Sequence, residues 1–436
     1  MGTLVMIGQV ILALSILIIL HELGHFLAAR MFGIKVEKFY LFFDAWGVKL
    51  FKFNYKGCEY GIGWLPLGGY VKISGMIDES MDTEQLKAEP KPWEFRSKPA
   101  WQRLIVMLGG IIVNVIVGIV VFWMITFKYG EADFDNTRLY GVKPGIIGQN
   151  IGLKDGDKIV GVNGNKANLF YKDLMTSDVL MGDATLQVER AGKVLDIVLP
   201  ATMLNEIAEH KRNEFVTPIF KILPIDSVYK ESRAEKMGLL KGDSIVAING
   251  VKVDRFDFFQ DEVAKSKGKE IKLDVIRGTD SLQLITAAAD TSSILGFTNP
   301  QPIVRRNYAF AESLPIGVNK AFSVITDNIK GFGKIFKGEV RADKALSGPV
   351  GIAKMFGKEV DWMRFWTLVG TLSMALAFMN LLPIPALDGG HVIFLLVEMV
   401  QGKPLSDKFL ETAQMVGFFI LIALMLFTFG NDILKW

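Results

Sequence analysis

Residues 4–29 read LVMIGQVILALSILIILHELGHFLAA, an apolar run that carries three ionisable side chains near its end. An apolar run of about 18 or more residues can cross a bilayer as a helix. His21, Glu22 and His25 would each cost roughly 2.5–3.5 kcal/mol at the centre of a bilayer. Three such groups need a shared partner, and metal binding worth on the order of 10 kcal/mol would offset their cost.

The segment His21-Glu22-Leu-Gly-His25 has the pattern H-E-x-x-H. A spacing of four on a helix puts the two imidazoles on one face, so both can bind the same Zn²⁺. Glu22 then lies beside the water that the metal activates and can act as general base. The alternative is a helix cap, or two histidines that reach toward the membrane interface, and it leaves the buried charges without a partner.

The composition of the chain excludes several classes of protein. Of its 436 residues, 50% are hydrophobic and 22% are charged, so membrane spans are joined to a soluble part. Lys and Arg total 49 against 46 Asp and Glu, and this balance argues against nucleic-acid binding. The single cysteine, Cys58, excludes a disulfide framework and a thiolate zinc site. Any metal ligand must therefore be His, Asp or Glu.

Four apolar segments predict transmembrane helices and a lipid bilayer as partner: residues 1–30, 101–127, 364–400 and 409–430. The first lacks the basic start and the cleavage site of a signal peptide, so we expect it to remain in the mature protein. Basic residues flank residues 31–100 and precede the last span. This distribution places 31–100 in the cytosol, and both termini and the chain between the second and third spans outside.

A sequence repeat lies between the second and third spans. GLKDGDKIVGVNG at 152–164 matches GLLKGDSIVAING at 238–250 at eight of thirteen positions. In each copy Gly-Asp predicts a turn, Ile-Val a buried strand and Asn-Gly a tight hairpin turn. An alternating strand that ends in Arg follows each copy, at 186–190 and at 273–277. Two unrelated turns would not share this spacing, so we predict duplicated domains.

The repeat resembles PDZ domains, which gives two inserted, mainly β domains at 128–205 and 215–290. PDZ domains capture an extended peptide or a chain end by adding it to a sheet edge. Residues 310–340 place apolar side chains at alternating steps of three and four with lysines elsewhere, which predicts an amphipathic helix. This helix could lie on the bilayer surface or pack against a PDZ domain, and the pattern leaves both open.

A catalytic zinc usually has three protein ligands and one open position. His210 lies in the soluble part, so the third ligand is His391 or a carboxylate. Asp388 follows Pro383 and Pro385, which break the third span. Irregular backbone inside a membrane is tolerated only next to protein or a water-filled cavity, and a carboxylate there is a functional candidate. We predict Asp388 as the third ligand and His391 as a neighbouring or packing residue.

Residues 36–73 are rich in aromatic residues and glycine with partial alternation, which predicts a membrane-associated β-hairpin or small sheet. If the metal site hydrolyses peptide bonds, a helical substrate must unwind near the metal, because its amides are hydrogen-bonded and shielded. A strand edge in this segment could pair with the unwound substrate and clamp it. An aromatic anchor at the membrane interface explains the same residues, and the sequence leaves both open.

These motifs together resemble the site-2 protease family of intramembrane zinc peptidases. The matching features are the H-E-x-x-H segment, Leu387-Asp388-Gly389 in the third span, GWLPLGGYV at 63–71, and the tandem PDZ repeats. The resemblance covers nearly the whole chain, and no motif position departs from it. It implies a polytopic α-helical membrane protein with four transmembrane helices, a membrane-associated β-hairpin or sheet, and two inserted PDZ domains.

The resemblance also implies a zinc endopeptidase that cuts within the membrane. It assigns roles to eight residues: His21, His25 and Asp388 as Zn²⁺ ligands, Glu22 as catalytic acid and base, Asn380 beside the substrate backbone, and Gly68, Gly69 and Tyr70 in substrate binding. The implied substrates are single-span proteins, such as an anti-sigma factor already trimmed by another protease in an envelope stress response. The implied location is the bacterial inner membrane, with the PDZ domains and both termini in the periplasm.

Two other functions explain part of the pattern. A zinc transporter would need intramembrane His and Asp residues, but it would leave Glu22 and the PDZ pair without a role. A membrane-tethered PDZ scaffold would explain the repeats, but not the ionisable residues in the first span.

Overall fold

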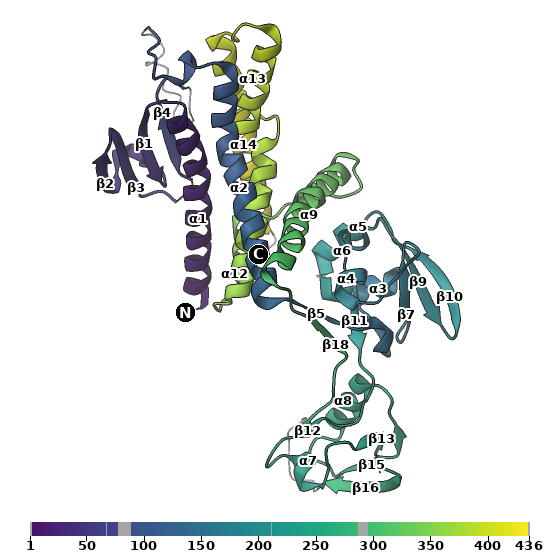
Figure 1. Cartoon of the computed structure of the whole chain (residues 1–436). Coiled ribbons are helices and arrows are strands. Elements are labelled where there is room, and N and C mark those ends of the chain that lie inside the picture. Colours follow the sequence, from purple (N-terminus) through teal and green to yellow (C-terminus); the bar gives the residue numbers. More distant parts are fainter. Residues whose placement is uncertain (1, 67, 77–88, 211, 287–294, 435–436) are drawn as a thin grey trace. The chain divides into compact units, whose positions relative to one another are not determined.

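The computed structural model describes residues 2–66, 68–76, 89–210, 212–286 and 295–434 (Figure 1). The chain divides into two compact units. The helical unit comprises Met1–Gly130, Asn307–Gly333 and Leu346–Trp436, and the repeat unit comprises Glu131–Arg306 and Lys334–Ala345.

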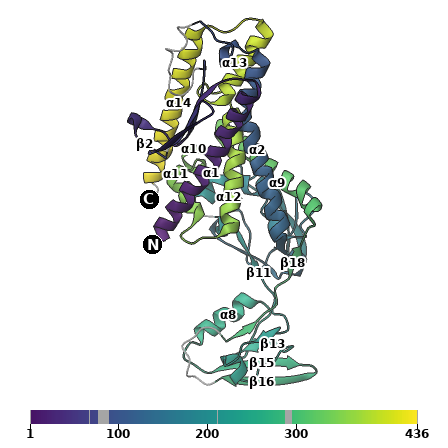
Figure 2. The same cartoon turned by 60° about the vertical axis from the view of Figure 1, so that its left-hand side comes forward.

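Four helices of the helical unit are long and apolar enough to cross a membrane. They are α1 (Gly2–Met31), α2 (Ala100–Tyr129), α12 (Trp362–Leu381) and α14 (Asp407–Leu434). Helix α2 packs against α1 and α12, and Figure 2 shows it beside both. The predicted polytopic membrane fold with four spans is confirmed.

The third apolar segment is broken, as Pro383 and Pro385 lead one to expect. Helix α12 ends at Leu381, and α13 (Asp388–Gln401) begins seven residues later and packs against α2. Between them, Ala386 adopts a positive φ of 77°. The break therefore puts Asp388 in the first turn of a new helix, beside the interior of the bundle.

A short helix, α11 (Pro349–Phe356), is tied to the end of α14. The carboxylate of Asp432 accepts hydrogen bonds from the backbone N–H groups of Gly348, Val350 and Gly351 at 2.8–3.1 Å. A buried carboxylate at a helix N-terminus satisfies donors that have no partner within the helix. This contact anchors the C-terminal end of the last span.

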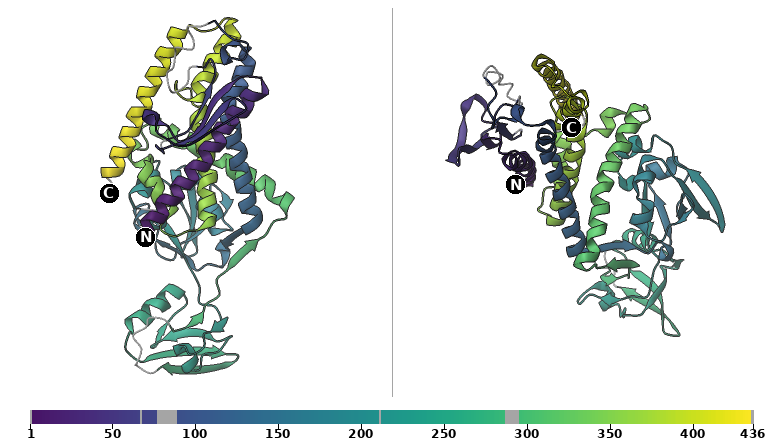
Figure 3. Two further views of the ribbon diagram at one scale, coloured as in Figure 1. Left: turned by 90° about the vertical axis from the view of Figure 1, so that its left-hand side faces the viewer. Right: turned by 45° about the horizontal axis from the view of Figure 1, so that its top comes forward.

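A four-stranded sheet follows α1 and lies against it (Figure 3). Its strands are β1 (Val36–Leu41), β2 (Lys49–Tyr55), β3 (Cys58–Gly63) and β4 (Tyr70–Ile73), in the order β2-β3-β1-β4. The β2–β3 hairpin matches the prediction, and the parallel pairing of β1 with β3 enlarges it into a sheet. Among the described residues β4 pairs only with β1, so its other edge is free.

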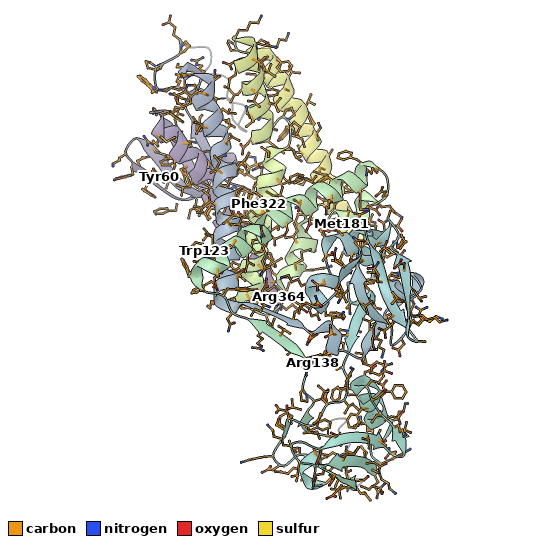
Figure 4. The ribbon with its side chains drawn as sticks, turned by 45° about the vertical axis from the view of Figure 1, so that its right-hand side comes forward. Tyr60, Trp123, Arg138, Met181, Phe322 and Arg364 are labelled. Carbon is orange, nitrogen blue, oxygen red and sulfur yellow. The ribbon has the colours of Figure 1, made fainter. Side chains whose placement is uncertain are left out.

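Helix α9 (Phe310–Phe336) is the amphipathic segment, and its part in the helical unit packs on α2. The indole N–H of Trp123 donates to the carbonyl of Phe310 at 2.8 Å, and the two rings are 4.4 Å apart. Ala321 is fully buried, whereas Phe322 is 45% exposed. Figure 4 labels Trp123 on α2 and Phe322 on α9. The apolar residues of α9 therefore lie on two faces of the helix, one packed and one exposed.

The repeat unit contains two equivalent four-stranded sheets, in the orders β10-β9-β7-β8 and β14-β13-β15-β16. The sheet strands are β7 (Lys158–Val162), β8 (Asn165–Lys166), β9 (Thr185–Arg190), β10 (Lys193–Val198), β13 (Ser244–Ile248), β14 (Val251–Lys252), β15 (Ile271–Arg277) and β16 (Asp280–Thr286). The other elements of the unit are β5 (Glu131–Phe134), β6 (Gly141–Pro144), α3 (Ile146–Asn150), α4 (Phe170–Leu174), α5 (Ser177–Met181), α6 (Met203–His210), β11 (Val216–Ile219), β12 (Ser227–Val228), α7 (Arg233–Lys236), α8 (Phe256–Lys265), β17 (Phe297–Thr298), β18 (Ile303–Arg306) and α10 (Ala342–Ala345). The prediction of two inserted, mainly β domains is confirmed.

The repeated sequence motif forms the same local structure in both copies. Asn163 and Gly164 have φ values of 52° and 78°, and Asn249 and Gly250 have φ values of 50° and 81°. Two consecutive positive φ angles define the hairpin turn that Asn-Gly favours. The arginine that ends the following strand pairs with the motif aspartate in each copy: Arg190 with Asp157 and Arg277 with Asp243.

Candidate metal centre and active site

Helix α1 presents His21 and His25 on one face, as their spacing predicts, with ring centroids 4.8 Å apart. Both imidazoles turn their Nδ1 atoms toward α2. Nδ1 of His25 lies 2.9 Å from the carbonyl oxygen of Val106, and Nδ1 of His21 lies 3.1 Å from the side-chain amide of Asn114. An Nδ1–H group held by a backbone carbonyl leaves the Nε2 lone pair free for a metal.

Close packing of α1 on α2 makes this arrangement possible. A Cβ atom on Gly24 would lie 2.2 Å from the carbonyl oxygen of Gly109, so the two backbones touch where the helices cross. A Cβ atom on Gly110 would lie 2.4 Å from Nε2 of His25 and 2.5 Å from Cε1 of His21. The absence of side chains on α2 therefore creates the space that the two imidazoles occupy.

Asp388, at the start of α13, completes a triangle of potential ligands. Oδ2 of Asp388 lies 3.4 Å from each Nε2 atom, and the two Nε2 atoms are 3.2 Å apart. Among the described residues, His21, His25 and Asp388 form the group whose atoms converge in this way. Oδ2 of Asp388 is buried and has no hydrogen-bond partner in the described part of the chain.

These three residues fit a zinc ion. Zinc binds His nitrogen and carboxylate oxygen at about 2.0–2.2 Å, and tetrahedral geometry then separates the ligand atoms by about 3.3–3.5 Å. The observed sides of the triangle, 3.2 and 3.4 Å, match this separation. Two neutral imidazoles and one carboxylate leave one coordination position open, which is typical of a catalytic site rather than a structural one.

Glu22 lies between this group and the sheet. A cavity of about 510 Å³ is lined by His21, Glu22, His25, Asp388 and, from the sheet, Tyr70 to Ile73. The backbone of Val71 on β4 is within hydrogen-bond reach of the Glu22 carboxylate. One edge of β4 thus faces the carboxylate that the H-E-x-x-H motif designates as general base.

The other residues named from the sequence lie at different distances from the triangle. The Asn380 amide, at the end of α12, is 3.3 Å from Nε2 of His21, and Tyr70 lines the cavity. Gly68 and Gly69 are not among the residues that line the cavity. They pack closely instead, since a Cβ on Gly68 would lie 2.8 Å from the Phe43 ring and one on Gly69 would lie 2.5 Å from Ile18. Their observed contacts are therefore with α1 and the sheet.

His391 lies near the triangle but outside it, as the sequence predicts. It lines the same cavity, and its ring contacts Phe394 at a centroid distance of 6.2 Å. A second cavity of about 590 Å³ shares His391, Gln414 and Met76 with the first. His391 therefore lies where the two cavities adjoin.

Polar groups fix the sheet side of the cavity. The Tyr70 hydroxyl donates to Oδ1 of Asp44 at 2.9 Å, and burial together with this bond raises the pKa of Tyr70, which stays a neutral donor. Lys49 and the Tyr40 hydroxyl both donate to Oε1 of Glu59 at 2.7 Å. These hydrogen bonds lower the pKa of Glu59 to about 2, so this carboxylate stays ionised.

Sequence reasoning missed Asn114 and Gly110. Asn114 is fully buried in α2, its side chain contacts His21, and its carbonyl accepts the Ser373 hydroxyl at 2.8 Å. An amide near the middle of an otherwise apolar span is a signal that could have found it, because such a polar group requires a partner in the bundle. Gly110 lies one helical turn before Asn114, on the same face of α2.

Comparison with known proteins identifies the family of this chain. The model of peptidase family M50 matches residues 9–424, and the chain belongs to that family. It is 28% identical over 450 residues to the regulator of sigma E protease of Haemophilus influenzae and 30% identical over 458 residues to protease RseP of Yersinia pestis. These alignments cover 98% and 99% of both chains. A putative zinc metalloprotease of Xylella fastidiosa is 27% identical over 458 residues.

Family membership and the four spans establish the general activity. The chain is a zinc metalloprotease of the intramembrane type and a multi-pass membrane protein similar to RseP. Among the residues that the structure describes, the group formed by His21, His25 and Asp388 could bind the metal.

Proposed function

We propose that this protease hydrolyses peptide bonds within the transmembrane segments of single-span proteins. His21, His25 and Asp388 would hold the zinc, and Glu22 would act as general acid and base. The observation that carries the proposal is the position of the ligand triangle, which shares one cavity with Glu22 and the edge of β4. A metal site that opens onto a strand edge is suited to an extended peptide.

Each residue has a defined task in the reaction. Bound zinc supplies a Lewis acid that polarises the scissile carbonyl and makes water a stronger nucleophile near neutral pH. The Glu22 carboxylate takes the proton of the attacking water and returns it to the leaving amine nitrogen. Asn380, with its amide 3.3 Å from Nε2 of His21, is positioned to hydrogen-bond the substrate backbone next to the reacting carbonyl.

Strand β4 would clamp the unwound substrate. Unwinding a transmembrane helix exposes its amides, and each unpaired amide in a low-dielectric environment costs several kcal/mol. The free edge of β4 offers backbone donors and acceptors beside the triangle, with Tyr70 held by Asp44. Gly69 would contribute by letting the chain before β4 approach Ile18 of α1 closely, and Gly68 by leaving room for the Phe43 ring.

The topology and the physiological substrate belong to the same proposal. Residues 31–100 would face the bacterial cytosol, and the repeat unit and both termini would face the periplasm. Substrates would be single-span proteins of the anti-sigma-factor type, already trimmed by another protease. The name of one relative, regulator of sigma E protease, connects that protein with sigma E. The repeats, taken as PDZ domains at 128–205 and 215–290, would exclude substrates with bulky ectodomains.

Two variants test the proposal. Glu22→Gln should retain zinc and lose cleavage of a single-span substrate in detergent by at least about a hundredfold, because an amide cannot take the proton. A transporter would tolerate this change. Deleting both repeats should permit cleavage of an untrimmed substrate without loss of zinc. Retained turnover in Glu22→Gln would refute the mechanism, and unchanged discrimination after the deletion would refute the filter.

A further inference from the structure

The second cavity, of about 590 Å³, adjoins the cavity that contains the ligand triangle. The two spaces meet at Met76, His391 and Gln414, which line both of them. The start of α2, most of the length of α13 and the beginning of α14 supply much of the wall of the second cavity. The reaction described above gives this space no role.

The charged side chains in the wall of the second cavity already have partners. Arg103 donates to the Glu398 carboxylate and to the carbonyl of Lys98, and the Arg103 and Glu398 side chains are only 14% and 15% exposed. Arg96 donates to the carboxylate of Glu94 at 2.7 Å. A charged ligand would have to break one of these pairs and leave a shielded charge uncompensated, which is costly. The cavity therefore suits an uncharged group.

The rest of the wall is mainly apolar. Its apolar side chains are Met76, Phe95, Phe394, Leu395, Pro404, Leu405 and Leu410. Phe95 and Leu395 are buried in the core beside α2, whereas Leu410 on α14 is partly exposed. Pockets that bind small ligands have volumes of about 300–1,000 Å³ and a mostly apolar lining with a few polar groups. The second cavity has both properties.

Strand β4 leads toward this cavity. The strand ends at Ile73 and the chain then turns, with the Met76 N–H donating to the Ile73 carbonyl at 3.3 Å and Gly75 at a φ of 72°. A substrate strand paired with β4 would lose its partner beyond Ile73, where Met76 lines both cavities. The backbone of Val71 lies near Glu22, so the scissile bond would lie close to Val71. At about 3.3 Å per residue, the side chain that reaches the second cavity would be about three to five residues from that bond.

We infer that the second cavity is a substrate subsite that takes one large apolar side chain, such as leucine or phenylalanine, on the cytosolic side of the scissile bond. The inference rests on the proposed function, in which an unwound substrate lies along β4 and residues 31–100 face the cytosol. Phe95 and Arg96, which line the cavity, belong to that cytosolic segment. The place of the cavity directly beyond the end of β4 favours a substrate side chain over a lipid acyl chain.

The test uses the full zinc-loaded chain in detergent and a set of single-span model substrates. Each substrate carries Leu or Ala at one position on either side of the scissile bond, and both residues are strong helix formers, so helix propensity changes little. At one position on the cytosolic side, the Leu substrate should be cleaved at least about tenfold faster than the Ala substrate. At the same distance on the other side of the bond, the two rates should be similar.

Variants that change the size of the cavity should change the preference in a matching way. Leu410→Trp narrows the cavity and should abolish the preference for Leu over Ala. Leu410→Ala widens it and should move the preference from Leu to Phe or Trp at the same substrate position. Leu426→Trp is the matched control, because Leu426 lies on the same helix, is 64% exposed and does not line the cavity. Zinc content measured for each variant reports whether the metal site is intact.

Binding can be measured without cleavage in the Glu22→Gln variant. A photoreactive apolar side chain at the selected substrate position should label the stretch from Phe394 to Leu410, which contributes most of the apolar wall. The same group on the other side of the scissile bond should not label this stretch. Leu410→Trp should reduce the labelling, and Leu426→Trp should leave it unchanged.

Three results would overturn the inference. The first is a wild type that cleaves the Leu and Ala substrates equally at every cytosolic-side position. The second is a pair of Leu410 variants that change all rates by one common factor, which would assign the cavity to lipid. The third is a Leu426→Trp control that abolishes the preference as Leu410→Trp does. If Leu410→Trp loses zinc, the shift of preference in Leu410→Ala decides alone. A wild type that holds zinc and cleaves none of the substrates would instead refute the proposed function.

Discussion

Gly110 and His25 meet so closely that no side chain fits between them: a Cβ atom on Gly110 would lie 2.4 Å from Nε2 of His25. Nε2 is the atom that faces Asp388, so the space created by Gly110 is part of the metal site. The same Cβ atom would lie 2.7 Å from Nδ1 of His21. A single position on α2 thus controls where both imidazoles lie.

Gly110→Ala should therefore reduce zinc affinity by about 10–100-fold, comparable to the loss of a group that orients a ligand. Gly8→Ala in α1 is the matched control, because a Cβ there meets no atom within 4 Å. Both changes gain about 1 kcal/mol of helix propensity, so propensity cannot account for a difference between them. Zinc content after dialysis against a graded chelator measures the effect. Equal zinc retention in the two variants would contradict the role given to Gly110.

Asp388→Asn and His391→Ala distinguish the two candidates for the third ligand. A neutral amide is a far poorer zinc ligand than a carboxylate, so Asp388→Asn should lose both zinc and activity. His391 lies outside the triangle, so His391→Ala should retain most of the zinc. Metal analysis of the two purified variants decides between them. Loss of metal from His391→Ala alone would mean that the third ligand is His391.

The sequence predicted the parts of this molecule that local rules determine. The spacing of His21 and His25, the hairpin turns at Asn163 and Asn249, and the break before Asp388 all follow from helix period, turn chemistry or proline. These features depend on residues close together in the chain. The spans and the two β repeats could be placed for the same reason.

Other features depend on which segments meet in space. No periodicity indicates that β1 and β3 pair in parallel, or that Gly24 and Gly109 make the crossing of α1 on α2. Asn114 is polar, but its partner His21 lies on another helix, 93 residues away. Gly68 and Gly69 do not line the cavity, and this too could not be predicted, because a sequence motif does not reveal which atoms each glycine contacts.

A proline scan from Tyr70 to Ile73 tests whether β4 clamps the substrate. Proline removes a backbone donor and fixes φ, so at least one position should lose most of the cleavage activity while zinc is retained. Val71→Ala is the control, since it keeps the N–H group that lies near Glu22. If the sheet were only an interfacial anchor, Phe53→Ala on β2 would reduce activity more than any proline on β4. Rates on a stable helical substrate and on one with a helix-breaking residue should both fall.

Asp157 and Arg190 form a buried ion pair that should make the first repeat sensitive to acid. Asp157 is 2% exposed, and Arg190 donates to both of its carboxylate oxygens at 2.6–2.7 Å. Burial alone would raise the pKa of Asp157, but the hydrogen bonds from Arg190 and from the Lys154 backbone outweigh burial and lower it. A carboxyl group whose pKa is lower in the folded state stabilises the fold above its unfolded pKa. That stabilisation is lost as the pH falls below about 4 through the lowered pKa.

Asp157→Asn should therefore destabilise the first repeat at pH 7 by about 2–3 kcal/mol, since it leaves a partly buried guanidinium without its charge partner. The gap between wild type and variant should narrow as the pH falls below 4, because protonation removes the same charge from the wild type. Glu189→Gln is the control in the same sheet. Glu189 pairs with Lys158 at 3.5 Å, and both side chains are more than a third exposed. This change should therefore lower the stability of the repeat by no more than about 0.5 kcal/mol. Hydrogen-exchange protection of the β7 and β9 amides in the full chain, corrected for intrinsic rates, measures both effects. A gap that stays constant from pH 7 to pH 3 would show that shape, not charge, is what Asp157 contributes.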